Sequence, residues 1–235
     1  MDFFNLLRSA EELLFELTMW IVLYPRTLWR SLRHPRALAH KINSELSQDG
    51  SRRFDDMVSP PICLLLSVAL GGALSPHEDA SDDTNALGDW LAQSFYNELV
   101  FSAVVSASLP LMFCWLLLRR QQRPFNRDNV RRPFYLQAYL VSPLALVLSP
   151  ALGLISDASL SPLRWTGGLL ALAVVAIYFF HTTRIAMQEL QCSATRGAML
   201  TLQAMLLSLL ILVLTAIALL DFPALMLAAE VSKPR

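Results

Sequence analysis

The stretch GAMLTLQAMLLSLLILVLTAIALL, residues 197–220, decides the fold class, because its 24 residues include no charged side chain. A membrane-spanning helix needs roughly 20 mostly apolar residues, with about 17 as a lower limit. Four further stretches meet this criterion, at residues 58–74, 91–118, 134–155 and 165–181. The chain is 54% hydrophobic and 16% charged, whereas about one quarter of a soluble domain is charged. We predict an all-α polytopic membrane protein with a bundle of about five transmembrane helices.

Positive charges are divided unevenly between the two sides of these five stretches. Eight Lys and Arg residues precede the first stretch, six lie between the second and third, and two lie between the fourth and fifth. Only Arg164, Lys233 and Arg235 fall on the other side, where the loop between the first two stretches is acidic. The positive-inside rule therefore predicts a cytoplasmic N-terminus and an external C-terminus. The expected regions are 1–57, cytoplasmic or interfacial; 58–221, transmembrane; and 222–235, a short external tail.

Residues 1–57 hold apolar runs that are too short to cross a membrane. The run at 13–24 contains Glu16 and is expected to stop at Pro25. Residues 26–46 have apolar side chains at helical spacing and five basic residues at other positions. This pattern is typical of amphipathic helices in the membrane interface, with Pro35 bending the helix or starting a second one. The alternative is a helix that packs on the cytoplasmic ends of the bundle.

The loop RRQQRPFNRDNVRR, residues 119–132, holds more arginines than topology alone requires. These arginines either serve topology alone or also contact anionic lipid headgroups or an acidic partner. Contact with lipid headgroups contributes about 1 kcal/mol per basic residue near the surface. The candidate lipid or partner contacts are Arg119, Arg120, Arg123, Arg127, Arg131, Arg132, Arg26, Arg30 and Arg33.

Few polar groups fall inside the predicted spans. Glu98 is the one carboxylate within a span, and Ser102 follows at four-residue spacing, so the pair is a candidate intramembrane polar site. The alternative places Glu98 in water at the outer interface. Pro110, Pro143 and Pro150 predict helix kinks, and broken helices line substrate sites in many transporters.

Small residues four positions apart predict close helix packing. The pairs are Ser102 with Ser106, Ala103 with Ala107, and Gly167 with Ala171. The Gly71-Gly72 pair in the first span either has the same role or kinks the helix. Such residues let helix backbones approach closely. Contacts within one bundle and contacts between two copies are both compatible with this pattern.

Catalytic signatures are missing from the sequence. There is no GxSxG, HExxH or nucleotide-binding motif. Cys63, Cys114 and Cys192 lack metal-ligand spacing. His181, at the end of the fourth span, is expected to anchor the helix at the interface. We expect no enzymatic activity, no metal or cofactor, and no nucleic-acid partner.

The segment YPRTLWRSLRHPRA, residues 24–37, places Trp29 and Leu32 between Pro25 and Pro35, ahead of the first span. With five spans and a cytoplasmic N-terminal region, it resembles the bacterial branch of the Ypt-interacting-protein (Yip) family. The resemblance implies a five-span α-helical fold in the bacterial inner (cytoplasmic) membrane and no known enzymatic activity. It transfers no site residues.

We predict a non-enzymatic inner-membrane protein that acts as a subunit or scaffold of a membrane complex. Helix packing and the basic cytoplasmic face would make its contacts, with membrane lipids, other subunits or a second copy as partners. The alternative is a small transporter or permease component that moves a small solute or lipid. A polar cavity that reaches the membrane midplane favours transport, and a dry, packed bundle favours the scaffold.

Overall fold

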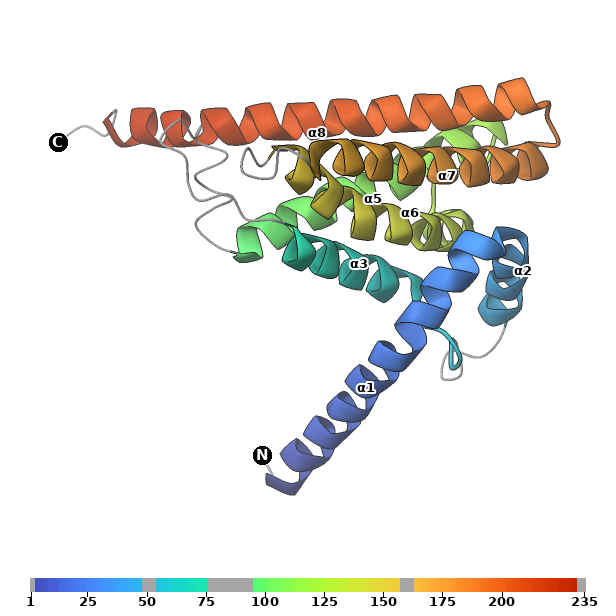
Figure 1. Cartoon of the computed structure of the whole chain (residues 1–235), viewed down its shortest axis with the longest axis horizontal. Helices are drawn as coiled ribbons and strands as arrows, with labels where there is room; N and C mark the ends of the chain where they lie inside the picture. Colours follow the sequence, from blue (N-terminus) through green and yellow to red (C-terminus); the bar gives the residue numbers. More distant parts are fainter. Residues whose placement is uncertain (1–2, 48–53, 76–94, 157–162, 232–235) are drawn as a thin grey trace.

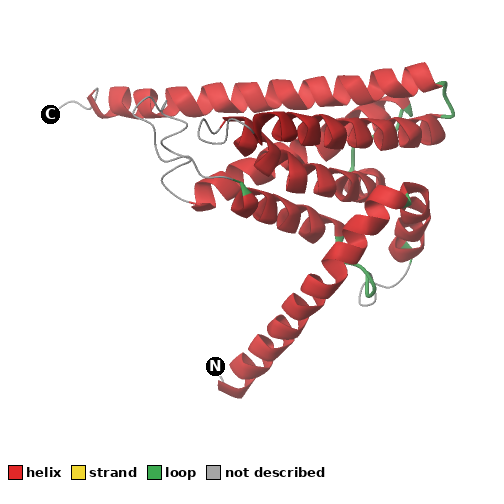
Figure 2. Cartoon of the chain, in the orientation of Figure 1, coloured by secondary structure: helices red, strands yellow, loops and turns green. Residues whose placement is uncertain are grey.

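The computed structural model describes residues 3–47, 54–75, 95–156 and 163–231. These residues form seven helices and no strand (Figure 2), which confirms the all-α prediction. The helices are α1 (Phe3–Arg33), α2 (Pro35–Leu46), α3 (Pro60–Leu74), α5 (Phe95–Arg120), α6 (Arg127–Ser156), α7 (Arg164–Leu190) and α8 (Ala194–Val231).

Four helices contain segments long and apolar enough to cross a membrane, so the chain is an all-α polytopic membrane protein. The segments are Val100–Arg120, Arg127–Ser156, Arg164–Leu190 and Ala194–Ile217. The fifth expected span is α3, which has only 15 residues. At 1.5 Å per residue it is about 22 Å long, shorter than the roughly 30 Å hydrocarbon core of a bilayer.

Helices α3, α5, α6, α7 and α8 lie side by side as a bundle, with α8 along one flank (Figure 1). Helix α6 is central, because it packs against α1, α2, α3, α5 and α7. Close approach within the bundle depends on glycine. A Cβ atom on Gly71 would lie 2.6 Å from the Ala145 carbonyl oxygen, and one on Gly167 would lie 2.7 Å from that of Ala151. The glycines predicted at helix contacts therefore pack α3 and α7 against α6.

Helix α1 runs through Pro25 without interruption, so the expected stop there is wrong. Pro25 removes the hydrogen bond to the carbonyl of Ile21, four residues earlier. Ile21 is 75% exposed, so the carbonyl that loses this bond lies on an exposed part of the helix. The chain breaks instead at His34, and Pro35 begins α2, as predicted for the second proline.

The two halves of α1 have different surroundings. The first half projects away from the bundle (Figure 1), and Leu14 and Phe15 there are 64% and 66% exposed. In the second half Tyr24 and Thr27 are buried, because this half packs on the end of the bundle. That packing agrees with the alternative given for residues 26–46, and the interfacial placement of these residues stays a prediction.

Hydrogen bonds join α1 to α3 and to Val58 just before it, and join Val58 to α6. The Thr27 hydroxyl oxygen accepts a bond from the Val58 N–H at 3.2 Å, and the Tyr139 hydroxyl donates to the Val58 carbonyl at 2.6 Å. The hydroxyls of Tyr24 and Ser67 lie 2.9 Å apart. These bonds surround the larger hydrophobic core, which takes side chains from α1, α2, α3, α6 and α7. A smaller core joins α5, α7 and α8.

The predicted external tail is not a separate segment over its described part. Helix α8 continues through Val231, giving 38 residues and a length of about 57 Å. The tail therefore begins, at residues 222–231, as an extension of the last helix.

Candidate functional site: the arginine end of the bundle

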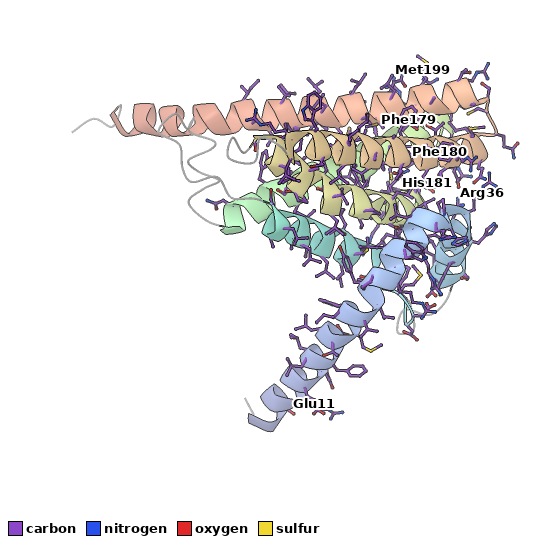
Figure 3. The ribbon with its side chains drawn as sticks, viewed as in Figure 1. Glu11, Arg36, Phe179, Phe180, His181 and Met199 are labelled. Carbon is purple, nitrogen blue, oxygen red and sulfur yellow. The ribbon has the colours of Figure 1, made fainter. Side chains whose placement is uncertain are left out.

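One end of the bundle, named here the arginine end, gathers most of the described basic residues. The second half of α1, α2, the turn at 121–126, the start of α6, the end of α7 and the start of α8 all meet there (Figure 1). Arg36 and His181 lie at this end, whereas Glu11 lies on the projecting part of α1 (Figure 3). Arg164, which begins α7, is at the opposite end. The grouping matches the charge asymmetry of the sequence.

The predicted loop of residues 119–132 is mostly helical, because α5 ends late and α6 begins early. Its arginines divide between the end of α5 (Arg119 and Arg120), the short turn (Arg123) and the first turns of α6 (Arg127, Arg131 and Arg132).

Three of the nine candidate arginines are held by polar contacts inside the chain. Arg132 forms two parallel bonds to the Glu189 carboxylate, at 2.9 and 3.1 Å, which tie α6 to α7. Arg30 lies 3.3 Å from Asp56. Arg131 stacks on Tyr135 and contacts its hydroxyl at 3.4 Å. These three side chains have structural roles.

Five of the remaining six candidates are available to outside groups. Arg26, Arg120 and Arg127 are exposed and form no ion pair within the described part of the chain. Arg33 and Arg119 stack on Trp29 and Trp115, at 5.4 and 5.2 Å from the ring centroids. Cation–π contacts of this kind leave the guanidinium edge free to donate hydrogen bonds.

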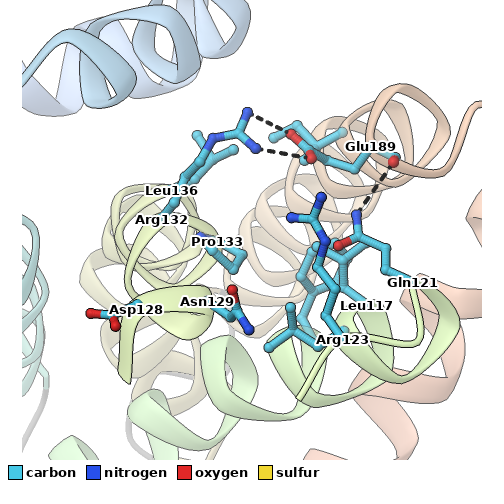
Figure 4. A pocket seen from close by; sticks show the side chains of 12 residues that line it. Leu117, Gln121, Arg123, Asp128, Asn129, Arg132, Pro133, Leu136 and Glu189 are labelled. Atoms are coloured by element: carbon cyan, nitrogen blue, oxygen red, sulfur yellow. Dashed lines mark hydrogen bonds and ion pairs between the residues drawn. The ribbon is translucent and has the colours of Figure 1, made fainter. Parts of the chain in front are cut away.

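A hollow of about 120 Å³ opens between α5, α6 and α7 at this end (Figure 4). Its rim is polar, with Arg123, the Arg132–Glu189 pair, and Gln121, whose amide donates to the Glu189 carbonyl at 3.3 Å. Its floor is apolar: Phe113, Leu117, Leu118, Leu136 and Ile185. Because Asp128 and Glu189 balance the two arginines, this hollow carries no net positive charge.

A polar cluster fixes the corner between α1 and α2. The Asp56 carboxylate accepts bonds from Arg30 on α1 and Lys41 on α2. Burial acts to raise the pKa of Asp56, but the bonds to Lys41 and Arg30 and their positive charges outweigh it and lower the pKa below its usual value. Asp56 is therefore ionised at neutral pH and holds the two helices together.

The predicted intramembrane polar site falls only partly within the described residues. The backbone of Glu98 belongs to α5, but its side chain lies outside the described part, and the membrane-crossing segment of this helix starts at Val100. Ser102 is half-buried. Pro110, Pro143 and Pro150 all lie within uninterrupted helices. The acidic loop between the first two predicted spans also lies outside the described residues.

A buried polar group between α6 and α7 was not predicted. The Tyr178 hydroxyl donates to the Gln137 side-chain oxygen at 3.3 Å, and both residues are buried. The Gln137 amide nitrogen and the Thr182 hydroxyl are also buried, without a hydrogen-bond partner in the described part of the chain. Gln137 and Tyr178 fall within predicted spans, so their polarity was the available signal.

Sequence reasoning also missed Glu189, Asp56 and Arg184 at the arginine end. Glu189 and Asp56 have partners far away in the sequence, whereas Arg184 stacks on Phe180, four residues earlier, and has no ion pair in the described chain. The described residues hold no group of three His, Cys, Asp or Glu side chains suited to a metal. Cys63 and Cys114 are buried as free thiols.

No protein-family model, curated protein or solved structure matches this chain. The fold therefore defines the class, a polytopic α-helical membrane protein with a basic end. The resemblance to the Yip family stays a prediction.

Proposed function

We propose that this chain is a non-enzymatic subunit or scaffold of a membrane complex, which contacts its partners through helix packing and the arginine end. The observation that supports it most is the exposure of Arg26, Arg120 and Arg127 without ion pairs in the described chain, beside arginines that are fixed internally. Exposed charges at one end of a bundle steer and orient an acidic surface.

The placement in a cell is part of the same proposal. The arginine end faces the cytoplasm, as the positive-inside rule predicts, and the membrane is a bacterial inner membrane. The projecting half of α1, with exposed Leu13, Leu14 and Phe15, supplies a second apolar contact, to the membrane interface or to another subunit.

Quantitative co-purification in mild detergent after cross-linking tests this function. Arg120→Gln combined with Arg127→Gln should reduce the recovered partner severalfold, because exposed charge pairs contribute mainly to encounter and orientation. Arg164→Gln, at the opposite end, is the control and should leave recovery unchanged. A monomer that has no partner and moves a solute in proteoliposomes would refute the scaffold.

The alternative, a small transporter, is favoured by the buried amide of Gln137 within the bundle. It predicts that Gln137→Leu, Glu98→Gln or Pro143→Ala abolishes uptake or efflux while the protein stays folded. Normal transport in all three variants would exclude this alternative.

A further inference from the structure

A second hollow at the arginine end lies between the α1–α2 corner and the last turns of α7. Its volume is about 330 Å³, within the range of small-molecule sites. It is distinct from the hollow of Figure 4, with which it shares only Ile185. The corner contributes Arg33, His34 and Arg36, and α7 contributes His181, Arg184 and Gln188.

The lining of this hollow is strongly cationic. Three guanidinium groups and two imidazoles surround it, and no carboxylate does. Arg33, Arg36 and Arg184 form no ion pair with any described residue. Guanidinium groups that converge without a counter-charge repel one another, and an anion placed among them relieves the repulsion. Their fork of N–H donors fits phosphate oxygens in particular.

Aromatic stacking orients two of these arginines. The Arg184 guanidinium lies 4.2 Å from the Phe180 ring centroid, and Arg33 lies over Trp29. Both rings are exposed, Trp29 by 60% and Phe180 by 51%. Trp rings on membrane proteins are enriched at headgroup depth. The guanidinium group of Arg33, which stacks on Trp29, is therefore expected at the depth of the lipid phosphates.

Exposed apolar side chains of α7 lie next to the hollow, among them Ile177 and Phe180. His181 lines the hollow and also borders a narrow crevice lined by Leu32, Pro143 and Ile177. Ile177 is 42% exposed, one turn before His181 on α7. A ligand whose phosphate sits among the arginines would therefore also meet exposed apolar side chains of α7.

We propose that this hollow binds the phosphate of an anionic membrane lipid. Arg33, Arg36 and Arg184 donate hydrogen bonds to the phosphate oxygens, and the acyl chains follow the exposed apolar face of α7. A free phosphate shares the headgroup chemistry, but it would leave the adjoining apolar surface unused. The site does not depend on the scaffold function, since it needs only the membrane placement of the bundle.

Native mass spectrometry of the full chain, titrated with phosphatidylglycerol at physiological ionic strength, tests the site. Arg36→Gln combined with Arg184→Gln should raise the apparent Kd by about tenfold or more, because two charge-assisted hydrogen bonds are lost. Arg26→Gln combined with Arg127→Gln removes the same charge from the same end outside the hollow. It should raise the Kd by less than about twofold, because exposed charges are screened.

Several outcomes would overturn the proposal. Equal weakening in the two double variants would mean diffuse attraction to the surface, and equal affinity for phosphatidylcholine would mean that no anion is recognised. Glycerol phosphate that binds as tightly as the lipid would make a soluble phosphate the ligand. If the glutamine pair fails to fold, Arg36→Lys with Arg184→Lys keeps the charge, and its weaker binding than wild type tests the bidentate contacts.

Discussion

Gly167 and Gly168 are neighbours in α7 with opposite surroundings. An added Cβ would clash with the Ala151 carbonyl and the Leu154 side chain at Gly167, and would meet nothing within 4 Å at Gly168. Gly167→Ala should therefore lower the free energy of unfolding by about 1–3 kcal/mol, as overpacking does. Gly168→Ala should be neutral or stabilising. Thermal unfolding in detergent compares the two, and equal effects would contradict the close packing of α7 on α6.

Asp56 gives a pH-dependent contact at the α1–α2 corner. Its pKa is lower in the folded protein than in the unfolded chain, so its stabilisation is complete above the usual carboxyl pKa and is lost as the pH falls through the folded-state value. Asp56→Asn should remove this acid sensitivity and increase hydrogen exchange in α2 at neutral pH.

The neighbouring Asp55 is the matched control for this experiment. It is exposed and has no ion pair in the described chain, so Asp55→Asn should leave exchange in α2 unchanged. Faster exchange in both variants would assign the effect to the turn rather than to the contacts with Arg30 and Lys41.

Single residues also mark the limit of prediction from sequence. Gly167 was predicted at a helix contact because small residues four positions apart let helix backbones approach closely in a membrane. The Arg132–Glu189 pair was not predictable, because helical spacing does not specify which distant charge a side chain meets. The hollow beside Arg36 and Arg184 depends on how the corner at His34 packs against α7, which the local pattern leaves undetermined.

Among the elements, α1 departs most from its prediction. A proline is most disruptive in a helix where the carbonyl four residues earlier is buried and left unpaired. For Pro25 that carbonyl belongs to Ile21, which lies on an exposed turn. The amphipathic pattern of residues 26–46 was correct about helicity. It did not distinguish an interface helix from one packed on the bundle, since both bury one face.

Deleting residues 3–18 should leave the bundle stable. Among the described side chains of α1, none before Trp20 packs against the core, so the free energy of unfolding should change by no more than about 0.5 kcal/mol. Thermal unfolding of the shortened chain measures this. Tyr24→Ala is the comparison, because it removes a buried ring and its bond to Ser67 and should destabilise by about 3 kcal/mol. A marked loss of stability on deletion would show that the first half of α1 supports the fold.

At the scale of the whole molecule, the number of spans depends on whether α3 crosses the membrane. Hydropathy and charge asymmetry predicted five spans, and the structure supplies four full-length ones and the 15-residue α3. Length alone does not decide between these counts, because bilayers thin and helices tilt around short spans. Composition predicted the overall class, because it constrains which segments enter the membrane more strongly than it constrains which residues contact each other.

Labelling with a membrane-impermeant maleimide in intact cells decides the count. With Cys192→Ser as background, Ser81→Cys should be labelled from outside if α3 crosses. In the otherwise native chain, Cys192 should react only after the cells are lysed, because it follows α7 at the arginine end. Protection of Ser81→Cys in intact cells would reduce the count to four and place both chain ends on one side.

The one-sided attachment of α1 makes this helix a cantilever. Its second half is fixed by Tyr24, Thr27 and Asp56 contacts, and about 30 Å of helix extends beyond them. The bending moment on such a beam is greatest at the clamp, where Pro25 has removed a hydrogen bond. A load on the free arm is therefore concentrated at Pro25, and the arm should sample several directions. Pro25→Ala should narrow the distance distribution between spin labels at Leu14→Cys and Arg127→Cys. An unchanged width would mean that the flexible point of α1 is not Pro25.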